Sequence, residues 1–364
     1  MNNIDVYLPI ISNTNMLDIM HLPPFLESLI LNQTNQTNPI NSYHPYLYVL
    51  AIYALLLIII GTIGNILTII ILLRPLLRKY TTMRYLIAVA VADLCSLYSW
   101  NLNLFYKHLI NPYQNDLEDL STISCRIISF IAFVSLELSS WFLTLVSVDR
   151  CLSIHFLFWP RKLGRPSYAV FIILTVTITI ILTNSHLLFL NGYKEKNCIP
   201  YEKRTCFICY SSLNDPYYIF PKWEKIHVII YNLIPFSIML VSNCFIIRRA
   251  IAVTSLINTR KNSSQIDRQR KQKQLTYLLL FVTFLFVLLT TPVMIYNVFL
   301  RNYLTKRKLM KYMLHGTLIC VQFTSHAINF FIYCYGSSKF RHELNEFLTN
   351  CVLKKKKTTL LRKL

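Results

Sequence analysis

The chain has 364 residues, of which 54% are hydrophobic and 15% charged, and its formal net charge is +21. A water-soluble domain carries about a quarter charged residues, so this composition indicates an integral membrane protein. The basic residues fall mainly in short segments between apolar runs, and the ten cysteines show no zinc-ligand spacing. We therefore expect the lipid bilayer, and no nucleic acid, as a partner.

The first 44 residues contain no lysine or arginine and lack the pattern of a signal peptide. They carry two adjacent Asn-x-Thr sequons, at Asn32 and Asn35. We expect residues 1–44 to form an extracellular N-terminal tail, in which both asparagines are candidates for glycosylation.

Charged residues divide the rest of the chain into seven apolar runs. Each run is long enough for a tilted transmembrane helix, and backbone groups in lipid must find their hydrogen bonds within the segment. The sequence therefore predicts seven transmembrane helices. The runs cover residues 45–73, 85–106, 125–150, 166–193, 226–247, 274–300 and 312–338.

Lysine and arginine are concentrated after the first, third and fifth runs and in the C-terminal tail. The positive-inside rule places these segments in the cytosol and the N-terminus outside, and only the basic segment after the sixth run disagrees. The expected fold class is an all-α membrane protein. A seven-helix bundle spans residues 45–338, and a short amphipathic cytoplasmic helix with a basic tail spans 339–364.

Four polar residues lie near the middle of predicted transmembrane helices: Asn65, Asp93, Ser139 and Asn329. Polar groups at this depth are costly and usually face the interior of the bundle. Their similar depth predicts one hydrogen-bonded cluster that could hold a cation or water.

The third run combines an acid in its middle with an acid–base pair at its cytosolic end. Glu137 is the only ionisable residue of the Asp, Glu, Lys, Arg or His type between Arg126 and Asp149. Two interpretations of Glu137 stay open, a hydrogen bond to a neighbouring helix and a contact with a ligand. Arg150 follows Asp149 directly, and Cys125 marks the opposite end of the run.

Prolines interrupt the fifth and sixth runs, at Pro235 and Pro292. A proline removes a backbone hydrogen bond and bends a helix. We expect these kinks to permit outward movement of the cytoplasmic halves of both helices.

Several motifs, in their order along the chain, resemble those of the rhodopsin-like G-protein-coupled receptors, and the likeness covers residues 45–350. Asp149-Arg150-Cys151 is similar to the DRY motif, and the segment from Asn329 to Tyr333 is similar to NPxxY with phenylalanine in place of proline. The other matching residues are Gly61, Gly64, Asn65, Asp93, Cys125, Pro235, Pro292, Phe340 and Arg341.

The resemblance implies a disulfide between Cys125 and the second extracellular loop. By analogy of spacing Cys206 is the first choice and Cys209 the second, and a further bridge from Cys198 to Cys209 is an open alternative. The loop faces an oxidising compartment in the expected topology, so disulfides can form there.

The resemblance also implies a plasma-membrane receptor without enzymatic activity, which acts on heterotrimeric G proteins and can meet arrestin. Release of Arg150 from Asp149 would let it contact a G protein, and Asp93 would bind sodium as an allosteric ion. No other cofactor is expected. The residues assigned to G-protein coupling are Asp149, Arg150, Cys151 and Tyr333.

Departures from the family pattern affect activation. Thr290 stands in place of the toggle tryptophan, Asn243 in place of a tyrosine, and Gln272 in place of an acid that locks the arginine in some members. A resting lock on the arginine would therefore come from Asp149 or Thr276.

The resemblance favours a peptide ligand. Ala132 stands where amine receptors carry aspartate, and Phe323 stands where opsins carry the retinal lysine. The N-F-F-I-Y-C segment resembles that of invertebrate neuropeptide receptors, including the FMRFamide-receptor-like group. The residues expected to line the ligand pocket are Ala132, Phe133, Leu136, Glu137, Thr290 and Phe323.

Other classes of protein fit the sequence less well. A small non-peptide ligand is the first alternative. A seven-helix chemosensory channel would need the opposite orientation, against the loop charges. A membrane enzyme is disfavoured because His315 and His326 have no acid near them in sequence.

The C-terminal tail combines a cysteine with a run of lysines. Cys351 precedes the lysines at positions 354–357. This pattern makes Cys351 a candidate for palmitoylation, with an unmodified cysteine at a helix end as the open alternative, and the lysines would attract the tail to anionic lipid.

Overall fold

The computed structural model describes residues 45–110, 117–156, 159, 164–194, 207–256, 263–301, 303 and 308–361. The expected glycosylation sites, Asn32 and Asn35, lie outside the described residues. So do two of the loop cysteines, Cys198 and Cys206.

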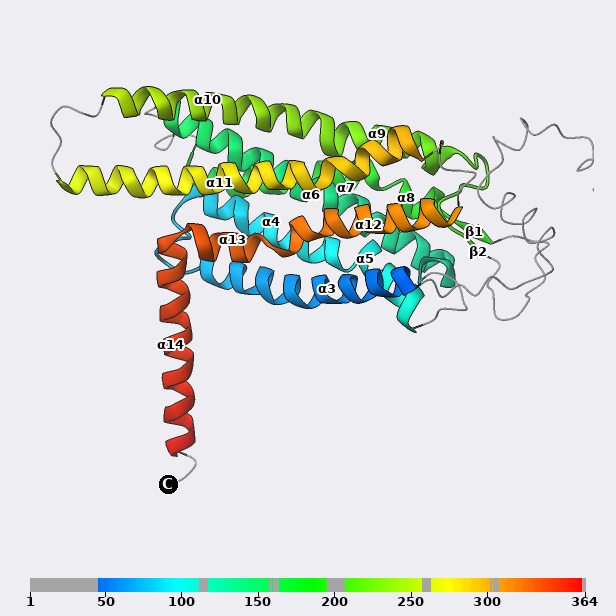
Figure 1. The fold of residues 1–364 in the computed structure, drawn as a ribbon, viewed down its shortest axis with the longest axis horizontal. Helices are drawn as coiled ribbons and strands as arrows, with labels where there is room; N and C mark the ends of the chain where they lie inside the picture. Colours follow the sequence, from blue (N-terminus) through cyan, green and yellow to red (C-terminus); the bar gives the residue numbers. More distant parts are fainter. Residues whose placement is uncertain are drawn as a thin grey trace, which may run out of the picture.

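The described chain is a bundle of long helices that lie side by side, as the sequence predicts (Figure 1). Six helices are long and apolar enough to cross a membrane, and a bent pair of helices forms a seventh span. These spans are α3 (Pro45–Leu72), α4 (Thr81–Leu97) with α5 (Trp100–Phe105) and η2 (Tyr106–Ile110), α6 (Thr122–His155), α7 (Pro166–Asn184) with α8 (Leu187–Leu190), η5 (Tyr218–Trp223) with α9 (Glu224–Val228), η6 (Ile229–Leu233) and α10 (Ile234–Leu256), α11 (Ser263–Ile295) with η7 (Tyr296–Leu300), and α12 (Lys308–Ala327) with α13 (Asn329–Gly336).

The third span, α6, lies at the centre of the bundle. In its apolar window 72% of the residues are buried, against 11% for the span of α7 and α8. The helix starts at Thr122 because the side chain of Ser121 accepts a hydrogen bond from the backbone N–H of Ser124 at 3.0 Å. The central position of α6 explains why its polar residues meet several neighbouring helices.

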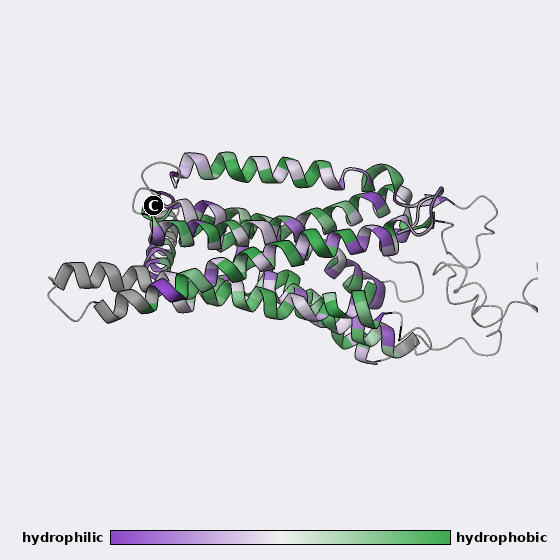
Figure 2. Cartoon of the chain, turned by 90° about the horizontal axis from the view of Figure 1, so that it is seen from above, coloured by the Kyte–Doolittle hydropathy of each residue, from purple (hydrophilic) through white to green (hydrophobic). Residues whose placement is uncertain are grey.

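The outer surface of the bundle is apolar, as contact with lipid requires. The long helices are mostly hydrophobic along their length when coloured by hydropathy (Figure 2). Large side chains such as Ile63, Phe171 and Leu240 are exposed on this surface. In a water-soluble protein so much exposed apolar area would favour aggregation, whereas here it fits a bilayer.

Irregular turns mark the fifth, sixth and seventh spans. The π-helical segment η6 ends just before the turn that contains Pro235, and η7 begins four residues after Pro292. In the seventh span α12 and α13 meet at an angle of 44° around Ile328. Such breaks leave backbone groups without helical partners and often mark places where a helix can move.

The last helix, α14 (Ser338–Leu361), begins at the end of the bundle, lies at a steep angle to the other helices and projects beyond them (Figure 1). Arg74, just after α3, forms ion pairs with Glu343 and with Glu346, the latter at 3.0 Å. These contacts hold α14 against the first cytoplasmic segment. Cys351 lies within α14, but its side chain is outside the described part of the chain, so its palmitoylation stays a prediction.

Glycines on α3 permit close packing against the seventh span. A Cβ atom at Gly64 would lie 3.0 Å from the Cβ of Phe330 on α13. Adding a side chain here requires the helices to separate, which we expect to cost about 1–3 kcal/mol. Gly64→Val should therefore lower the thermal unfolding temperature of the detergent-purified protein.

The matched control for this prediction is Ile63→Phe, which adds volume on the lipid-facing side, where Ile63 is 57% exposed. This variant should unfold at the wild-type temperature. Equal unfolding temperatures for Gly64→Val and the wild type would contradict the proposed packing.

Candidate functional site

A cavity of about 550 Å³ opens at the end of the bundle nearest the hairpin of strands β1 (Tyr193–Lys194) and β2 (Phe207–Ile208). Its wall combines aromatic side chains with charged groups of both signs. This volume is within the usual range for sites that hold small ligands. The aromatic lining residues are Trp100, Phe133 and Tyr210, the acids are Glu118 and Glu224, and the basic or titratable nitrogens belong to Lys107, His108, His227, Arg301 and His315.

A short hairpin of β1 (Tyr193–Lys194) and β2 (Phe207–Ile208) is tethered to α6 beside this cavity. The strands are antiparallel, with Tyr193 opposite Ile208. Cys209 follows β2 directly and forms a disulfide with Cys125. A Cβ atom at Gly192 would lie 2.8 Å from the sulfur of Cys125, so glycine is needed for this close approach.

The disulfide corrects the expected pairing. Cys206, the first choice, is wrong, and the second choice, Cys209, is the partner of Cys125. The open alternative of a Cys198–Cys209 bridge is excluded, because Cys209 is already bonded. The physical reason is the hairpin register, which carries Cys209 to the outer end of α6.

Tyr210 connects this hairpin to the wall of the cavity. The indole N–H of Trp100 donates to the Tyr210 hydroxyl at 2.5 Å, and that hydroxyl donates to Glu118 at 2.7 Å. Burial, with the nearby Glu118 carboxylate, raises the pKa of Tyr210 well above its ordinary value, so the hydroxyl stays a donor. Its φ of 58° lies in the left-handed region that few residues other than glycine adopt.

A charge pair joins the fifth and sixth spans at the cavity. Arg301 donates to Glu224 at 3.0 Å, and both residues line the cavity. The same wall includes Glu118 and Lys107. The two carboxylates and the two cationic side chains of the wall therefore balance in formal charge.

Only two of the six expected pocket residues line this cavity, Phe133 and Leu136. Glu137 instead accepts a hydrogen bond from Asn184 on α7 at 2.8 Å, which agrees with the structural interpretation of this acid. The other three, Ala132, Thr290 and Phe323, are fully buried and are not among the lining residues.

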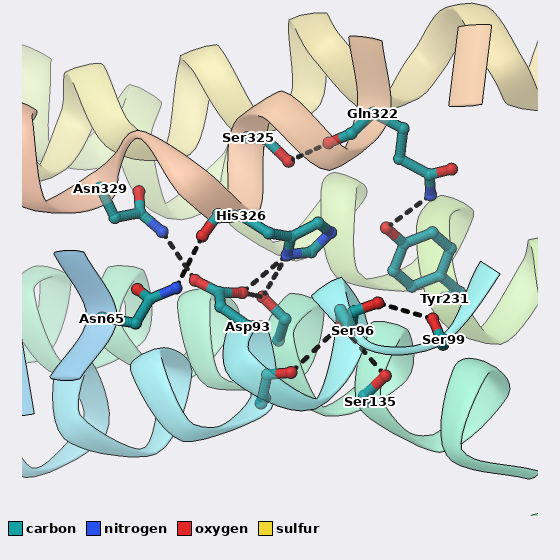
Figure 3. A network of polar contacts seen from close by, with 12 residues as sticks. Asn65, Asp93, Ser96, Ser99, Ser135, Tyr231, Gln322, Ser325, His326 and Asn329 are labelled. Atoms are coloured by element: carbon teal, nitrogen blue, oxygen red, sulfur yellow. Dashed lines mark hydrogen bonds and ion pairs between the residues drawn. The ribbon is translucent and has the colours of Figure 1, made fainter. Parts of the chain in front are cut away.

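The expected polar cluster is assembled around Asp93 in the middle of the bundle (Figure 3). Ser139 donates to Asp93 Oδ1 at 2.6 Å, and Asn329 donates to Oδ2 at 2.8 Å. His326 Nδ1 lies 2.6 Å from Oδ1, and Asn65 donates to the His326 carbonyl at 2.9 Å. The structure thus brings all four expected residues together and adds a fifth, His326.

His326 was missed because the sequence places no acid near it. Asp93 is 233 residues away along the chain, and only the bundle brings the two side chains together. One signal could have found it: a histidine three residues before Asn329 is at the depth of the polar cluster and on a neighbouring face of the same helix.

The hydrogen-bond donors around Asp93 show whether the site suits the expected sodium ion. Both carboxylate oxygens already accept hydrogen bonds from the protein, and one of them is reached by the imidazole of His326. Because a carboxylate only accepts, the nearby nitrogen carries the proton. An N–H that points at the carboxylate oxygen cannot coordinate a cation, so this donor set does not fit sodium.

The cytoplasmic end of α6 holds the expected acid–base pair. Arg150 lies 3.5 Å from Asp149 Oδ2, a long contact. The same carboxylate accepts from Thr82 at 2.6 Å and from the indole of Trp159 at 3.3 Å. Tyr333 is buried on α13, and its hydroxyl has no hydrogen-bond partner among the described residues.

The sequence matches the family model "7 transmembrane receptor (rhodopsin family)" over residues 64–333, which is more than half of the chain. The chain therefore belongs to the rhodopsin family of seven-transmembrane receptors, and it is a multi-pass plasma-membrane protein rather than an enzyme.

One known relative is a purinoceptor of Rattus norvegicus, which is 27% identical over 171 residues. The match covers 46% of this chain and 42% of the purinoceptor, so the chain spans less than half of that relative's length. Neither match bears on the resemblance to FMRFamide-receptor-like proteins, which stays a prediction.

The disulfide gives a direct prediction. Cys209→Ser should lower the free energy of unfolding by about 2–5 kcal/mol and reduce surface expression, because it frees the hairpin from α6. Cys206→Ser is the matched control and should leave both unchanged. Surface staining and thermal unfolding would measure the effects, and loss of stability in Cys206→Ser alone would contradict the assigned pairing.

Proposed function

We propose that the protein is a receptor that binds a peptide in its outer cavity and activates heterotrimeric G proteins. The cavity carries this proposal, because it places balanced charges of both signs around aromatic side chains. A peptide offers backbone donors and acceptors together with charged and apolar groups, which such a wall can match. A volume of about 550 Å³ suits the end of a peptide rather than its whole length.

A small purine-type ligand is the second candidate. The name of the purinoceptor relative suggests it, and Lys107 and Arg301 in the cavity could attract phosphate groups. However, Arg301 is already paired with Glu224, and Glu118 lines the same wall. A polyphosphate would have to lie beside two carboxylates, so the charges support a peptide more strongly.

The seventh span provides a route from the cavity to the polar cluster. Gln322 lines the cavity, and its side-chain amide donates to the Tyr231 hydroxyl at 3.1 Å. His326, one helical turn further along α12, contacts Asp93. A ligand that moves Gln322 therefore shifts the balance between two arrangements of the bundle, which the bend at Ile328 accommodates.

Arg150 is the group that meets the G protein in this mechanism. Its contact to Asp149 is long, and Thr82 and Trp159 compete for the same carboxylate. Release of the guanidinium therefore leaves Asp149 with hydrogen-bond donors and costs little. The freed guanidinium is then able to bind a carbonyl or carboxylate group of the G protein.

This proposal predicts a peptide response that depends on Arg150. Cells that express the receptor would be tested with libraries of peptides and of nucleotides, with calcium and cAMP as readouts. We expect a saturable response to one peptide and an at least about tenfold lower maximal response for Arg150→Ala, since the G-protein contact is lost. Surface expression of the variant should match the wild type.

Arg84→Ala is the matched control, because Arg84 is also a cytoplasmic arginine but bonds only to the Arg78 carbonyl among the contacts described. It should respond like the wild type. A response to nucleotides alone would contradict the peptide assignment and support the purine candidate. An undiminished response of Arg150→Ala would show that coupling to the G protein does not depend on Arg150.

A further inference from the structure

His326 is fully buried at the centre of the bundle. Its Nδ1 lies 2.6 Å from Asp93 Oδ1 and 3.5 Å from the hydroxyl of Ser139. The rings of Phe286 and Phe323 also pack near the imidazole, each with a centroid distance of 5.9 Å. The aromatic rings thus confine the imidazole beside the carboxylate.

The backbone of the same residue takes part in the cluster. Asn65 on α3 donates to the His326 carbonyl at 2.9 Å, while the side chain of His326 reaches Asp93 on α4 (Figure 3). One residue of α12 therefore connects two other helices. The Asp93 carboxylate receives three protein donors, which is enough to stabilise a buried negative charge without an ion.

We infer that His326 takes the place that the family resemblance gives to sodium, so that this receptor does not depend on sodium. A bound sodium ion would need oxygen ligands, including one free oxygen of Asp93. Here Ser139 and Asn329 donate to that carboxylate, and the third neighbour offers an N–H. The inference concerns the polar cluster alone and holds whichever ligand fills the outer cavity.

Thermal unfolding of the purified receptor tests this without a ligand. The unfolding temperature would be compared in sodium chloride and in N-methylglucamine chloride at equal concentration. We expect the same value for the wild type in both salts. His326→Ser removes the ring and supplies a hydroxyl oxygen, and it should unfold at least about 3 °C higher in sodium than in N-methylglucamine.

Two further variants separate the effect of losing the imidazole ring from the effect of gaining a hydroxyl oxygen. His326→Ala also removes the ring but supplies no oxygen, so it should gain less from sodium than His326→Ser. Adding Asp93→Asn to His326→Ser should abolish the gain. Stabilisation of the wild type by sodium would overturn the inference, and so would a His326→Ser variant that is as indifferent to sodium as the wild type.

A second, independent observation concerns a groove of about 680 Å³ between α10 and α11. Its rim residues include Leu233, Leu240 and Phe284, which are exposed on the lipid-facing surface of the bundle. None of its lining residues is Asp, Glu, Lys, Arg or His. An occupant of this α10–α11 groove is therefore an uncharged molecule of the bilayer.

Asn232 is the unusual residue of the α10–α11 groove. It is only 5% exposed, and neither atom of its side-chain amide has a hydrogen-bond partner among the described residues. Other polar lining residues are paired: Ser237 bonds to a backbone carbonyl at 2.7 Å and Asn243 to Thr283 at 2.9 Å. A groove that opens to hydrocarbon contains no water that could bond to the amide. A polar group of a membrane molecule could therefore satisfy the unpaired NH₂ and carbonyl of Asn232.

We propose that the α10–α11 groove binds a membrane sterol, whose hydroxyl pairs with Asn232. A hydroxyl both donates and accepts, so it can satisfy the carbonyl and the NH₂ of one amide. A fatty-acid carboxylate only accepts and would carry charge into an apolar site. A sterol has one polar group and a rigid body, so no further polar atom is left unpaired and little conformational freedom is lost.

Photolabelling in reconstituted vesicles tests this site. The probe is a photoreactive cholesterol analogue, competed by cholesterol or by oleate, with labelled peptides located by mass spectrometry. We expect labelling of α10 and α11 that cholesterol suppresses and oleate does not. Asn232→Leu should reduce it at least about fivefold, since both hydrogen bonds are lost.

Ser237→Ala is the matched control, because the Ser237 hydroxyl is already bonded to the backbone, and it should label like the wild type. Leu240→Trp fills the groove from its rim and should also block labelling, which guards against misfolding of Asn232→Leu. Labelling outside α10 and α11, or undiminished labelling in both groove variants, would overturn the proposal.

Discussion

The structure depends on how it accommodates one buried carboxylate. Asp93 lies in the middle of the bundle, where an unpaired charge would be very costly. Ser139, His326 and Asn329 compensate for this cost with donors from α6, α12 and α13. Since each donor comes from a different helix, satisfying the carboxylate fixes the relative positions of four helices, counting α4 itself.

The seventh span connects this centre to both ends of the molecule. Gln322 faces the outer cavity, His326 and Asn329 reach Asp93, and Tyr333 lies deeper toward the cytoplasmic end. The 44° bend falls between His326 and Asn329, the two residues of this span that contact the carboxylate. A change in the bend would therefore alter the central hydrogen bonds together with the position of Tyr333.

Much of the fold follows from the sequence alone, because charged side chains that face lipid are costly, so that most of them lie between the spans. The cluster around Asp93 was also predictable, since polar residues at one depth tend to meet. The partner His326 and the pairing of Cys209 were not, because both depend on contacts between distant segments. The pocket residues could be predicted only in part, since the sequence does not show how α6 is rotated, and Glu137 bonds to Asn184 on α7 without lining the cavity itself.

The register of the small hairpin has a consequence for how the outer face is made. A slip of one residue between β1 and β2 would turn Cys209 to the other side of the ribbon, away from Cys125. The Cys125–Cys209 disulfide is therefore expected to form only when β1 and β2 have paired in this register. The disulfide therefore stabilises the one strand register that also brings Tyr210 to Trp100 and Glu118.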